Sequence, residues 1–314
     1  AAPNFEPRRM HLAALLALSA NVGQVQIGTG RGELPVATLT HPSGATAEVY
    51  LHGAHVTSWR PADGVERLFV SSASRYAAGK AIRGGIPVCF PQFSGRGPLP
   101  NHGFARTSSD WQVESTSSDG PGGEVCLVLR LSDSAETRAV WPHAFELRYT
   151  VTLRDASLST DVQLRNAGGE PLEFTAALHT YLATPQVGTA AVVGLAGLSY
   201  EDNTEGGAAY TELAEAVRVR GEVDRVYLDA PDLLQLRHEG PAVELTKRNL
   251  RDVVLWNIGG EKAAAMADLG AGEWQRYLCL ESGAVGSALR VLPGETFAAG
   301  QTLSSSCAAP THPS

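Results

Sequence analysis

The feature that most constrains the fold of this chain is a long succession of short segments in which apolar and polar residues alternate. A period of two places successive side chains on opposite faces of a β-strand. The clearest segments are residues 126–131 (CLVLRL), 145–153 (FELRYTVTL), 158–166 (LSTDVQLRN) and 171–183 (PLEFTAALHTYLA). Strands that follow one another so closely, with few helical stretches between them, predict an all-β sandwich or barrel of antiparallel strands.

Similar alternation extends this pattern over most of the chain. It marks residues 36–42, 45–53, 55–61 and 68–71 before the central set, and 226–229, 233–240, 242–249, 253–258 and 277–283 after it. Gly53 is expected to lie at a turn or bulge between two of the early strands. Two segments depart from the pattern, because residues 74–80 fit a helical turn and residues 211–220 fit the start of a helix.

The chain shows no change of composition of the kind that separates domains. Its 314 residues could hold two domains, but they contain no linker-like segment, internal repeat or low-complexity run. A hydrophobic content of 43% is sufficient for a large core. We therefore predict one β domain over residues 23–303, preceded by an N-terminal arm (1–22, with a short helix at 10–19) and followed by a disordered tail (304–314).

Charge and hydropathy argue against two classes of partner. The net charge is -8, the sequence pI is about 5.6, and no dense basic run is present, so nucleic acid is not expected to bind. No apolar run approaches the ~20 residues of a membrane helix, so no membrane partner is expected. An anionic ligand would have to be held by locally placed arginines against an overall negative field.

The four cysteines are far apart and form no C-x-x-C pair, so their spacing indicates neither a zinc site nor a redox dithiol. We expect Cys89, Cys126 and Cys279 to be small core residues of a protein in a reducing, soluble compartment, although two disulfides are arithmetically allowed. The expected compartment is the cytoplasm, or the plastid stroma if an N-terminal transit peptide has been removed.

Residues 81–111 carry three arginines and a histidine among glycines and prolines: Arg83, Arg96, His102 and Arg106. Glycine lets a backbone approach a ligand closely, and proline fixes the shape of a loop. The guanidinium group offers a rigid fork of donors that suits phosphate or carboxylate oxygens. The segment therefore indicates either a preformed site for an anionic polar ligand or a pair of surface turns with solvated arginines.

No P-loop, dinucleotide-binding fingerprint, HExxH or GxSxG motif is present, which leaves a mechanism based on acid–base side chains. His179 lies on the more polar face of residues 171–183, where it could transfer protons or be a hydrogen-bonded structural histidine. Glu281 ends an apolar run, so it is either a salt-bridged residue at a strand end or a base whose pKa is raised by burial. Asp224 could bind a sugar hydroxyl or pair with Arg225.

Several motifs, taken together, resemble those of one family. They are IRGGIP (82–87), FPQF (90–93), HGFAR (102–106) with Trp111, LHTY (178–181), DRVY (224–227), VLWN (254–257) and CLE (279–281). In order and number they resemble the glucose-6-phosphate 1-epimerases, also called hexose-6-phosphate mutarotases, which include the plant apospory-associated protein C. One departure is Ile258, which stands where the family often has proline.

The resemblance implies a large antiparallel β-sandwich of the galactose mutarotase-like superfamily and interconversion of hexose 6-phosphate anomers without a cofactor or metal. It implies that His179 is the general acid and Glu281 the general base. The resemblance also implies that Arg83 and Arg106 contact the substrate, including its phosphate. His102 and Asp224 would bind sugar oxygens, and Gln92 would be a further contact. Arg96 lies between the motifs and is expected to be a solvated loop residue.

The expected partner is a small-molecule hexose phosphate, and the monomer is the favoured state. Two other functions stay open at this point. One is a carbohydrate-binding module that has the cavity but no turnover, although such a module would need neither His179 nor Glu281. The other is an aldose 1-epimerase for unphosphorylated sugars, which two arginines among the matched positions make less favourable.

Overall fold

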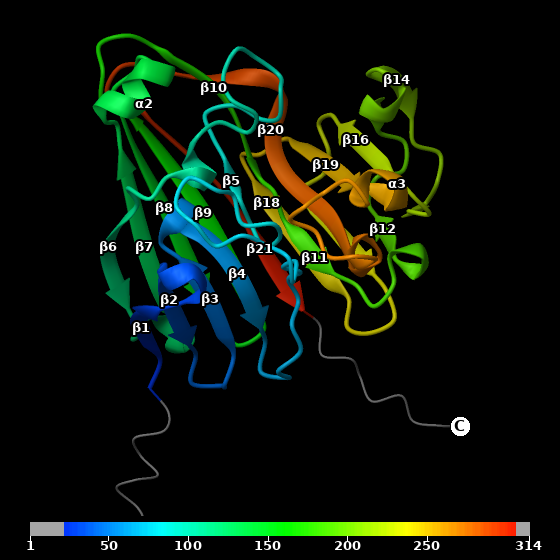
Figure 1. Ribbon diagram of the computed structural model, residues 1–314, viewed down its shortest axis with the longest axis horizontal. Coiled ribbons are helices and arrows are strands. Elements are labelled where there is room, and N and C mark those ends of the chain that lie inside the picture. Colours follow the sequence, from blue (N-terminus) through cyan, green and yellow to red (C-terminus); the bar gives the residue numbers. More distant parts are fainter. Residues whose placement is uncertain (1–21, 306–314) are drawn as a thin grey trace, which may run out of the picture.

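The structure is a computed structural model that describes residues 22–305, within which the strands form three antiparallel sheets (Figure 1). The expected helix at 10–19 and most of the expected arm and tail lie outside the described residues. The last strand extends to Ser305, two residues beyond the predicted end of the domain. No helix within 22–305 is long and apolar enough to cross a membrane.

The four-stranded sheet is formed by the first strands in chain order: β1 (Gln24–Thr29), β2 (Pro35–Thr40), β3 (Thr46–Tyr50) and β4 (His55–Arg60). Alternation separates its two faces, because Ala47 and Val49 are fully buried while Glu48 between them is exposed. Gly53, with φ +72°, lies in the short connection before β4, and the β3–β4 register shifts after Glu48. The expected turn or bulge is therefore confirmed.

The nine-stranded sheet forms the back layer in Figure 1. Its strands, in spatial order, are β15 (Ala216–Arg218), β12 (Ala191–Val193), β17 (Leu233–Arg237), β18 (Val243–Arg248), β21 (Thr296–Ser305), β9 (Ser157–Asn166), β8 (Phe145–Leu153), β7 (Val125–Ser132) and β6 (Gln112–Ser117). The central strands read as strict alternation in the sequence because one face is buried, as the burial pattern of β7 shows.

The eight-stranded sheet carries two of the predicted site residues, Asp224 and Glu281. Its main path is β14 (Ala208–Thr211), β13 (Ser199–Asp202), β16 (Val223–Tyr227), β19 (Asp252–Asn257), β20 (Tyr277–Val291), β10 (Leu172–Leu178) and β5 (Val88–Cys89), and β11 (Tyr181–Ala183) pairs with β20. Its two faces differ. Val253, Leu255 and Leu280 belong to the main core, whereas Val254 and Cys279 belong to small clusters on the opposite face.

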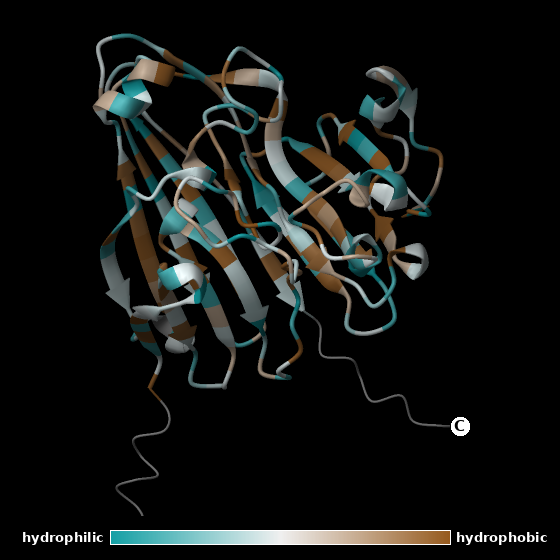
Figure 2. Ribbon diagram, viewed as in Figure 1, coloured by the Kyte–Doolittle hydropathy of each residue, from teal (hydrophilic) through white to brown (hydrophobic). Residues whose placement is uncertain are grey.

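One hydrophobic cluster joins all three sheets, with Val49, Leu147 and Leu280 as buried members from the four-, nine- and eight-stranded sheets. Isolated bridges, such as Val56 to Ile86, connect the four-stranded sheet to the segment before β5. The four-stranded and eight-stranded sheets together cover the nine-stranded sheet (Figure 1). Brown and teal bands alternate along the strands (Figure 2). The predicted all-β fold is confirmed as a sandwich.

Helices are few and short within the described part of the chain. The α-helices are α2 (Ala135–Val140) and α3 (Gly259–Ala263), and the 3-10 turns are η2 (Arg31–Glu33), η3 (His52–Ala54), η4 (Ala105–Thr107), η5 (Pro121–Gly123), η6 (Val187–Thr189), η7 (Asn203–Glu205) and η8 (Glu273–Arg276). Helix α2 begins with a reciprocal capping box between Ser134 and Thr137, a signal that the alternation pattern did not reveal.

Three local predictions were wrong. Residues 74–80 form turns without a helix, and residues 68–71 contribute only isolated bridges. Residues 211–220 end β14 and form β15, which pairs with β12 at the sheet edge. Strand pairing there overrides a helix-forming composition, because intrinsic propensity is weaker than tertiary pairing.

Candidate active site

A cavity of about 280 Å³ opens on the face of the eight-stranded sheet that points away from the main core. Six of the seven predicted site residues line it, and they come from segments far apart in the chain: Arg83, His102, Arg106, His179, Asp224 and Glu281. The remaining lining residues are Phe93, Ser94, Asn101, Asn203, Val254, Trp256 and Met266. The structure therefore brings the predicted acid, base and cations into one space.

His179 lies where the first of two strands ends. The expected long strand over 171–183 is interrupted after Leu178, so His179 falls between β10 and β11. Its backbone N–H donates to Pro87, which ties it to the segment before β5. The prediction of a mid-strand position is wrong, because the pairing of β10 with both β5 and β20 stops at Leu178.

Glu281 lies in the middle of β20 rather than at a strand end, since β20 continues to Val291. It pairs with Val254 of β19 and shares a face with Cys279. The side chain is 1% exposed, which makes it one of the most deeply buried carboxyl groups of the described chain.

The two side chains meet at the floor of the cavity. Nδ1 of His179 lies 3.4 Å from Oε1 of Glu281. The geometry is not that of a hydrogen bond, since His179 Nδ1 has no hydrogen-bond partner within residues 22–305, and neither does Oε2 of Glu281. Buried polar atoms without partners are costly, so both atoms are available to the polar groups of a ligand.

Burial shifts the two groups in opposite directions. Loss of solvation raises the pKa of Glu281 well above its usual value, and the nearby Asp224 carboxylate adds to the increase. Loss of solvation lowers the pKa of His179, and the charges of Arg106 and Arg83 lower it further. Both shifts favour the uncharged forms, a protonated Glu281 carboxyl group and a neutral His179 imidazole.

Aromatic rings fix the plane of the His179 imidazole. The ring stacks on Tyr181, with centroids 4.8 Å apart and an interplanar angle of 8°. Trp256 meets it edge-on at 5.7 Å, and His102 lies 5.4 Å away on a tilted ring. A ring held on these sides presents its free nitrogen in one direction, which is the condition for directed proton transfer.

Arg83 is positioned by the glycine pair that follows it. Gly84 has φ +118°, and a Cβ there would lie 2.3 Å from the carbonyl oxygen of Phe69, so the close approach of the two segments requires glycine. The guanidinium of Arg83 donates to Asp268 and to the hydroxyl of Tyr181. Neither partner was found from the sequence.

Arg106 lies on η4, which packs against η3. A Cβ at Gly53 would lie 2.4 Å from the carbonyl oxygen of Arg106, and Trp111 anchors the same turn by donating to Ala105. Nη2 of Arg106 donates to the Asn101 carbonyl at 3.1 Å. Its buried Nε has no partner among the described residues, so this arginine can still donate to a ligand.

His102 is held as a neutral hydrogen-bond donor. Its Nδ1 accepts the backbone N–H of Ser94 at 3.2 Å, which leaves the proton of the neutral ring on Nε2. Burial, together with the charges of Arg106 and Arg83, lowers its pKa to about 3. Nδ1 also lies 3.2 Å from the buried thiol of Cys89.

Asp224 lines the cavity from β16 and accepts from the Asn203 amide at 2.8 Å. Burial raises its pKa. The expected alternative, a pair with Arg225, is wrong, because Arg225 points to the other face of β16 and pairs with Asp202 and Glu212. Asn203 itself gave no sequence signal.

The side chains of Gln92 and Arg96 make contacts that differ from those expected. Gln92 does not line the cavity: its amide donates to the Ser94 and Leu99 carbonyls and accepts from the Leu99 N–H, so it pins the loop that follows it. Arg96 is not simply solvated, since it forms a 2.6 Å ion pair with Glu201. Both residues hold the loop beside the cavity.

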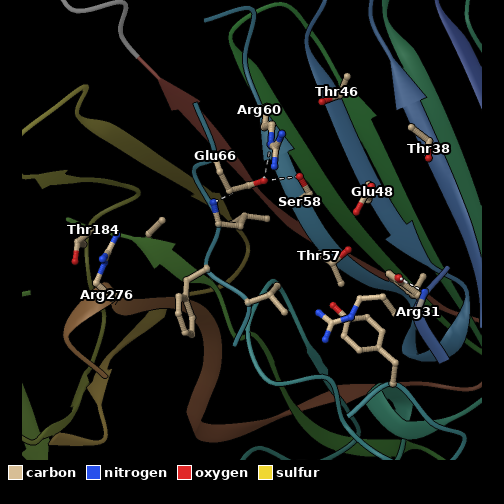
Figure 3. Close-up of a pocket in the computed structure, with 16 residues that line it drawn as sticks. Arg31, Thr38, Thr46, Glu48, Thr57, Ser58, Arg60, Glu66, Thr184 and Arg276 are labelled. Carbon is tan, nitrogen blue, oxygen red and sulfur yellow. Dashed lines mark hydrogen bonds and ion pairs between the residues drawn. The ribbon is translucent and has the colours of Figure 1, made fainter. Parts of the chain in front are cut away.

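A larger cavity of about 570 Å³ lies elsewhere, over the outer face of the four-stranded sheet (Figure 3). Its floor carries threonines and Glu48, and Glu66 there accepts from Ser58 and Arg60. None of its lining residues is a histidine, and the Glu66 carboxylate is already fully bonded. The described lining of the larger cavity therefore offers neither the histidine nor the buried, unpaired carboxyl oxygen that the predicted acid–base pair supplies in the smaller one.

The family model described as aldose 1-epimerase matches residues 35–304. The chain belongs to the aldose 1-epimerase family. Relatives in the family include proteins named "Putative glucose-6-phosphate 1-epimerase" from Cenchrus ciliaris and Escherichia coli K12. The first is 38% identical over 259 residues, which cover 80% of this chain and 78% of the relative. The second is 32% identical over 255 residues, which cover 80% of this chain and 83% of the relative.

Solved structures of aldose 1-epimerase-like proteins share the fold. A "putative mutarotase" from Salmonella typhimurium superposes with a TM-score of 0.82 at 24% identity, covering 93% of this chain and 99% of that one. Galactose 1-epimerase from Lactobacillus acidophilus NCFM gives a TM-score of 0.68 at 14% identity, covering 90% and 99%. The expected galactose mutarotase-like sandwich is confirmed.

Proposed function

We propose that the protein interconverts the α and β anomers of hexose 6-phosphates, with glucose 6-phosphate as the preferred substrate. The observation that carries the proposal is the buried pair of His179 and Glu281, whose facing atoms lie 3.4 Å apart, in a cavity that also holds two arginines. The relatives' names, which refer to glucose-6-phosphate 1-epimerase, agree with it.

The reaction requires two proton transfers at neighbouring oxygens. Glu281 as carboxylate accepts the proton of the anomeric hydroxyl, while His179 as imidazolium donates a proton to the ring oxygen. The C1–O5 bond breaks and leaves an open-chain aldehyde. Rotation about C1–C2 presents the other face, the O5 hydroxyl attacks C1 and returns its proton to His179, and Glu281 protonates O1.

Glu281 and His179 together carry the one exchangeable proton that this reaction needs. The opposite pKa shifts leave the transferable proton of the pair on Glu281, and its transfer to His179 gives the reactive carboxylate and imidazolium. A carboxylate whose pKa is raised by burial is a stronger base than a solvated one. A positioned acid or base typically contributes ~10² to 10⁴ in rate.

The remaining cavity residues would hold the substrate. Arg83 and Arg106 supply charged donors that suit a phosphate dianion, which fixes the distance between the phosphate and the reacting end of the sugar. His102, through Nε2–H, and Asp224 would bind sugar hydroxyls. All these groups belong to one chain, so the proposal requires no second subunit and favours action as a monomer.

Each proton transfer has its donor and acceptor among the cavity's own side chains, so the proposed reaction draws on no cofactor. Three cysteines are free within residues 22–305, and Cys89 and Cys279 lie beside the site residues. Free cysteines are consistent with the proposed reducing, soluble compartment, which is the cytoplasm, or the plastid stroma if an N-terminal transit peptide has been removed.

A second candidate is an aldose 1-epimerase for unphosphorylated sugars. One observation favours it: Arg83 already has a carboxylate partner, Asp268, and so is not an uncompensated anion site. Arg106 favours the phosphorylated substrate, because no described carboxylate pairs with it and its buried Nε lacks a partner.

Two-dimensional exchange NMR between the anomers tests the function directly. We expect the folded protein to accelerate exchange of glucose 6-phosphate far above buffer, and exchange of free glucose much less. Equal acceleration of both sugars would support the second candidate. An exchange rate equal to that of buffer, with folded protein, would contradict both. Arg83→Ala should weaken the response to the phosphorylated sugar and leave free glucose nearly unchanged.

A further inference from the structure

The guanidinium of Arg83 is occupied on three of its N–H groups in the structure. Its Nε and Nη2 both donate to one oxygen of Asp268, Oδ2, at 3.2 and 3.1 Å. Its Nη1 donates to the Tyr181 hydroxyl at 3.2 Å. A guanidinium has five N–H donors, so two are left for a ligand in the cavity that Arg83 lines.

Asp268 is held in place by its own loop, which links α3 to η8. Its neighbour Leu269 is buried against Tyr277 and Phe69, and the N–H of Gly270 donates to Ser71 and to Glu273. The carboxylate itself is not part of the cavity wall, whereas Met266 of the same loop is. Asp268 is therefore a fixed counter-charge behind Arg83.

We propose that Asp268 is a specificity-determining residue that acts through Arg83: it aims the guanidinium at the cavity and limits how tightly the phosphate is held. The inference rests on the proposed function, since it takes the phosphate of a sugar phosphate as the ligand of Arg83. It assigns Asp268 no contact with the sugar and no proton transfer.

The electrostatics of the pair support both halves of this role. Burial alone would lower the pKa of Arg83, but Tyr181 and Asp268 raise it above its usual value, so the arginine is charged throughout. The same carboxylate neutralises part of that charge and repels an incoming dianion. The side chains are 22% and 26% exposed, so the opposing effects are only partly screened by water.

Such a counter-charge benefits an enzyme whose product differs from its substrate by one stereocentre. Phosphate binding is equal in substrate and product, so tighter binding lowers KM without speeding the chemical step and slows product release. A carboxylate that offsets part of the attraction keeps the phosphorylated product from remaining bound.

The test uses two substitutions of opposite effect and calorimetric Kd values. Asp268→Asn keeps an oxygen that accepts from Nε and Nη2 but removes the negative charge. We expect it to bind inorganic phosphate and glucose 6-phosphate roughly three- to tenfold tighter than wild type at low salt, with a smaller gain at high salt, and glucose equally. Asp268→Ala also removes the oxygen that orients Arg83, so it should bind inorganic phosphate and glucose 6-phosphate more weakly than Asp268→Asn does.

Glu114→Gln is the matched control, because Glu114 pairs with Arg148 at the edge of the other layer and its neutralisation changes the net charge equally. We expect wild-type Kd values from it. Unchanged or weaker phosphate binding by Asp268→Asn would overturn the proposal. Because inorganic phosphate reports on Arg83 without any sugar, this outcome is separate from a failure of anomer exchange in the wild-type protein.

Discussion

The imidazole of His179 stacks on the phenol of Tyr181, with centroids 4.8 Å apart and planes 8° from parallel. The Tyr181 hydroxyl accepts a hydrogen bond from Arg83 at 3.2 Å. One side chain thus packs against the proposed acid and, at its other end, holds the proposed phosphate anchor. The reacting and the anchoring parts of the cavity share this support.

Removing only the hydroxyl of Tyr181 separates its packing against His179 from its hydrogen bond with Arg83. Tyr181→Phe keeps the stacked ring but deprives Arg83 of one acceptor. We expect KM for glucose 6-phosphate to rise a few-fold while kcat stays close to wild type, with a stability loss of about 1 kcal/mol from the lost hydrogen bond. Anomer-exchange rates over a substrate series would measure both constants. A large fall in kcat with unchanged KM would show that the hydroxyl serves the imidazole.

The acid and base should be needed for turnover but not for binding. His179→Asn and Glu281→Gln each preserve size and polarity, and we expect each to lower kcat by ~10² to 10⁴. The double variant should be scarcely worse than either single one, because one proton passes between partners that act as a unit. Exchange NMR gives the rates, and calorimetry with glucose 6-phosphate gives Kd, which should change little. Near-wild-type rates in both single variants would rule out these roles.

The loop beside the cavity offers a test of whether Gln92 acts through its loop contacts or as a substrate contact. Gln92→Ala removes three hydrogen bonds to Ser94 and Leu99. We expect a loss of stability of roughly 1–3 kcal/mol, since half-buried backbone groups of Ser94 and Leu99 lose their partners. Denaturant unfolding would measure it. The ratio of activity on glucose 6-phosphate to that on glucose should stay at the wild-type value, and a selective loss for the phosphate would restore Gln92 as a substrate contact.

The strands could be predicted because one face of each is buried. Residues 145–153 were predicted from alternation alone and coincide with β8, and Glu281 shares a face with Cys279 as the period of two requires. The end of β10 could not be predicted, since it depends on where pairing with β5 and β20 stops.

The residues of the candidate site could be found from the sequence only where they lie in recognisable motifs. Asp268 and Asn203 come from turns without periodicity, and their importance follows from what lies across space from them, Arg83 and Asp224. Gln92 illustrates a second limit of motif matching. It belongs to a matched motif, but its side chain bonds to its own loop, a contact that sequence spacing does not encode.

The burial of Glu281 should make the stability of the protein depend on pH in a stated direction. The pKa of Glu281 is raised well above its unfolded value of about 4.3, so between these two values the folded state binds more protons than the unfolded state. Stability from this group is complete below the unfolded pKa and is lost as pH rises through the folded pKa. Glu281→Gln cannot ionise, so its melting temperature relative to wild type should increase from pH 4 to pH 8. The neutral variant Glu114→Gln, whose parent carboxylate is exposed to solvent, should show no such increase. If the difference in melting temperature between wild type and Glu281→Gln does not change with pH, Glu281 titrates like a solvated carboxyl group. Burial would then not make it a stronger base, which contradicts its proposed role.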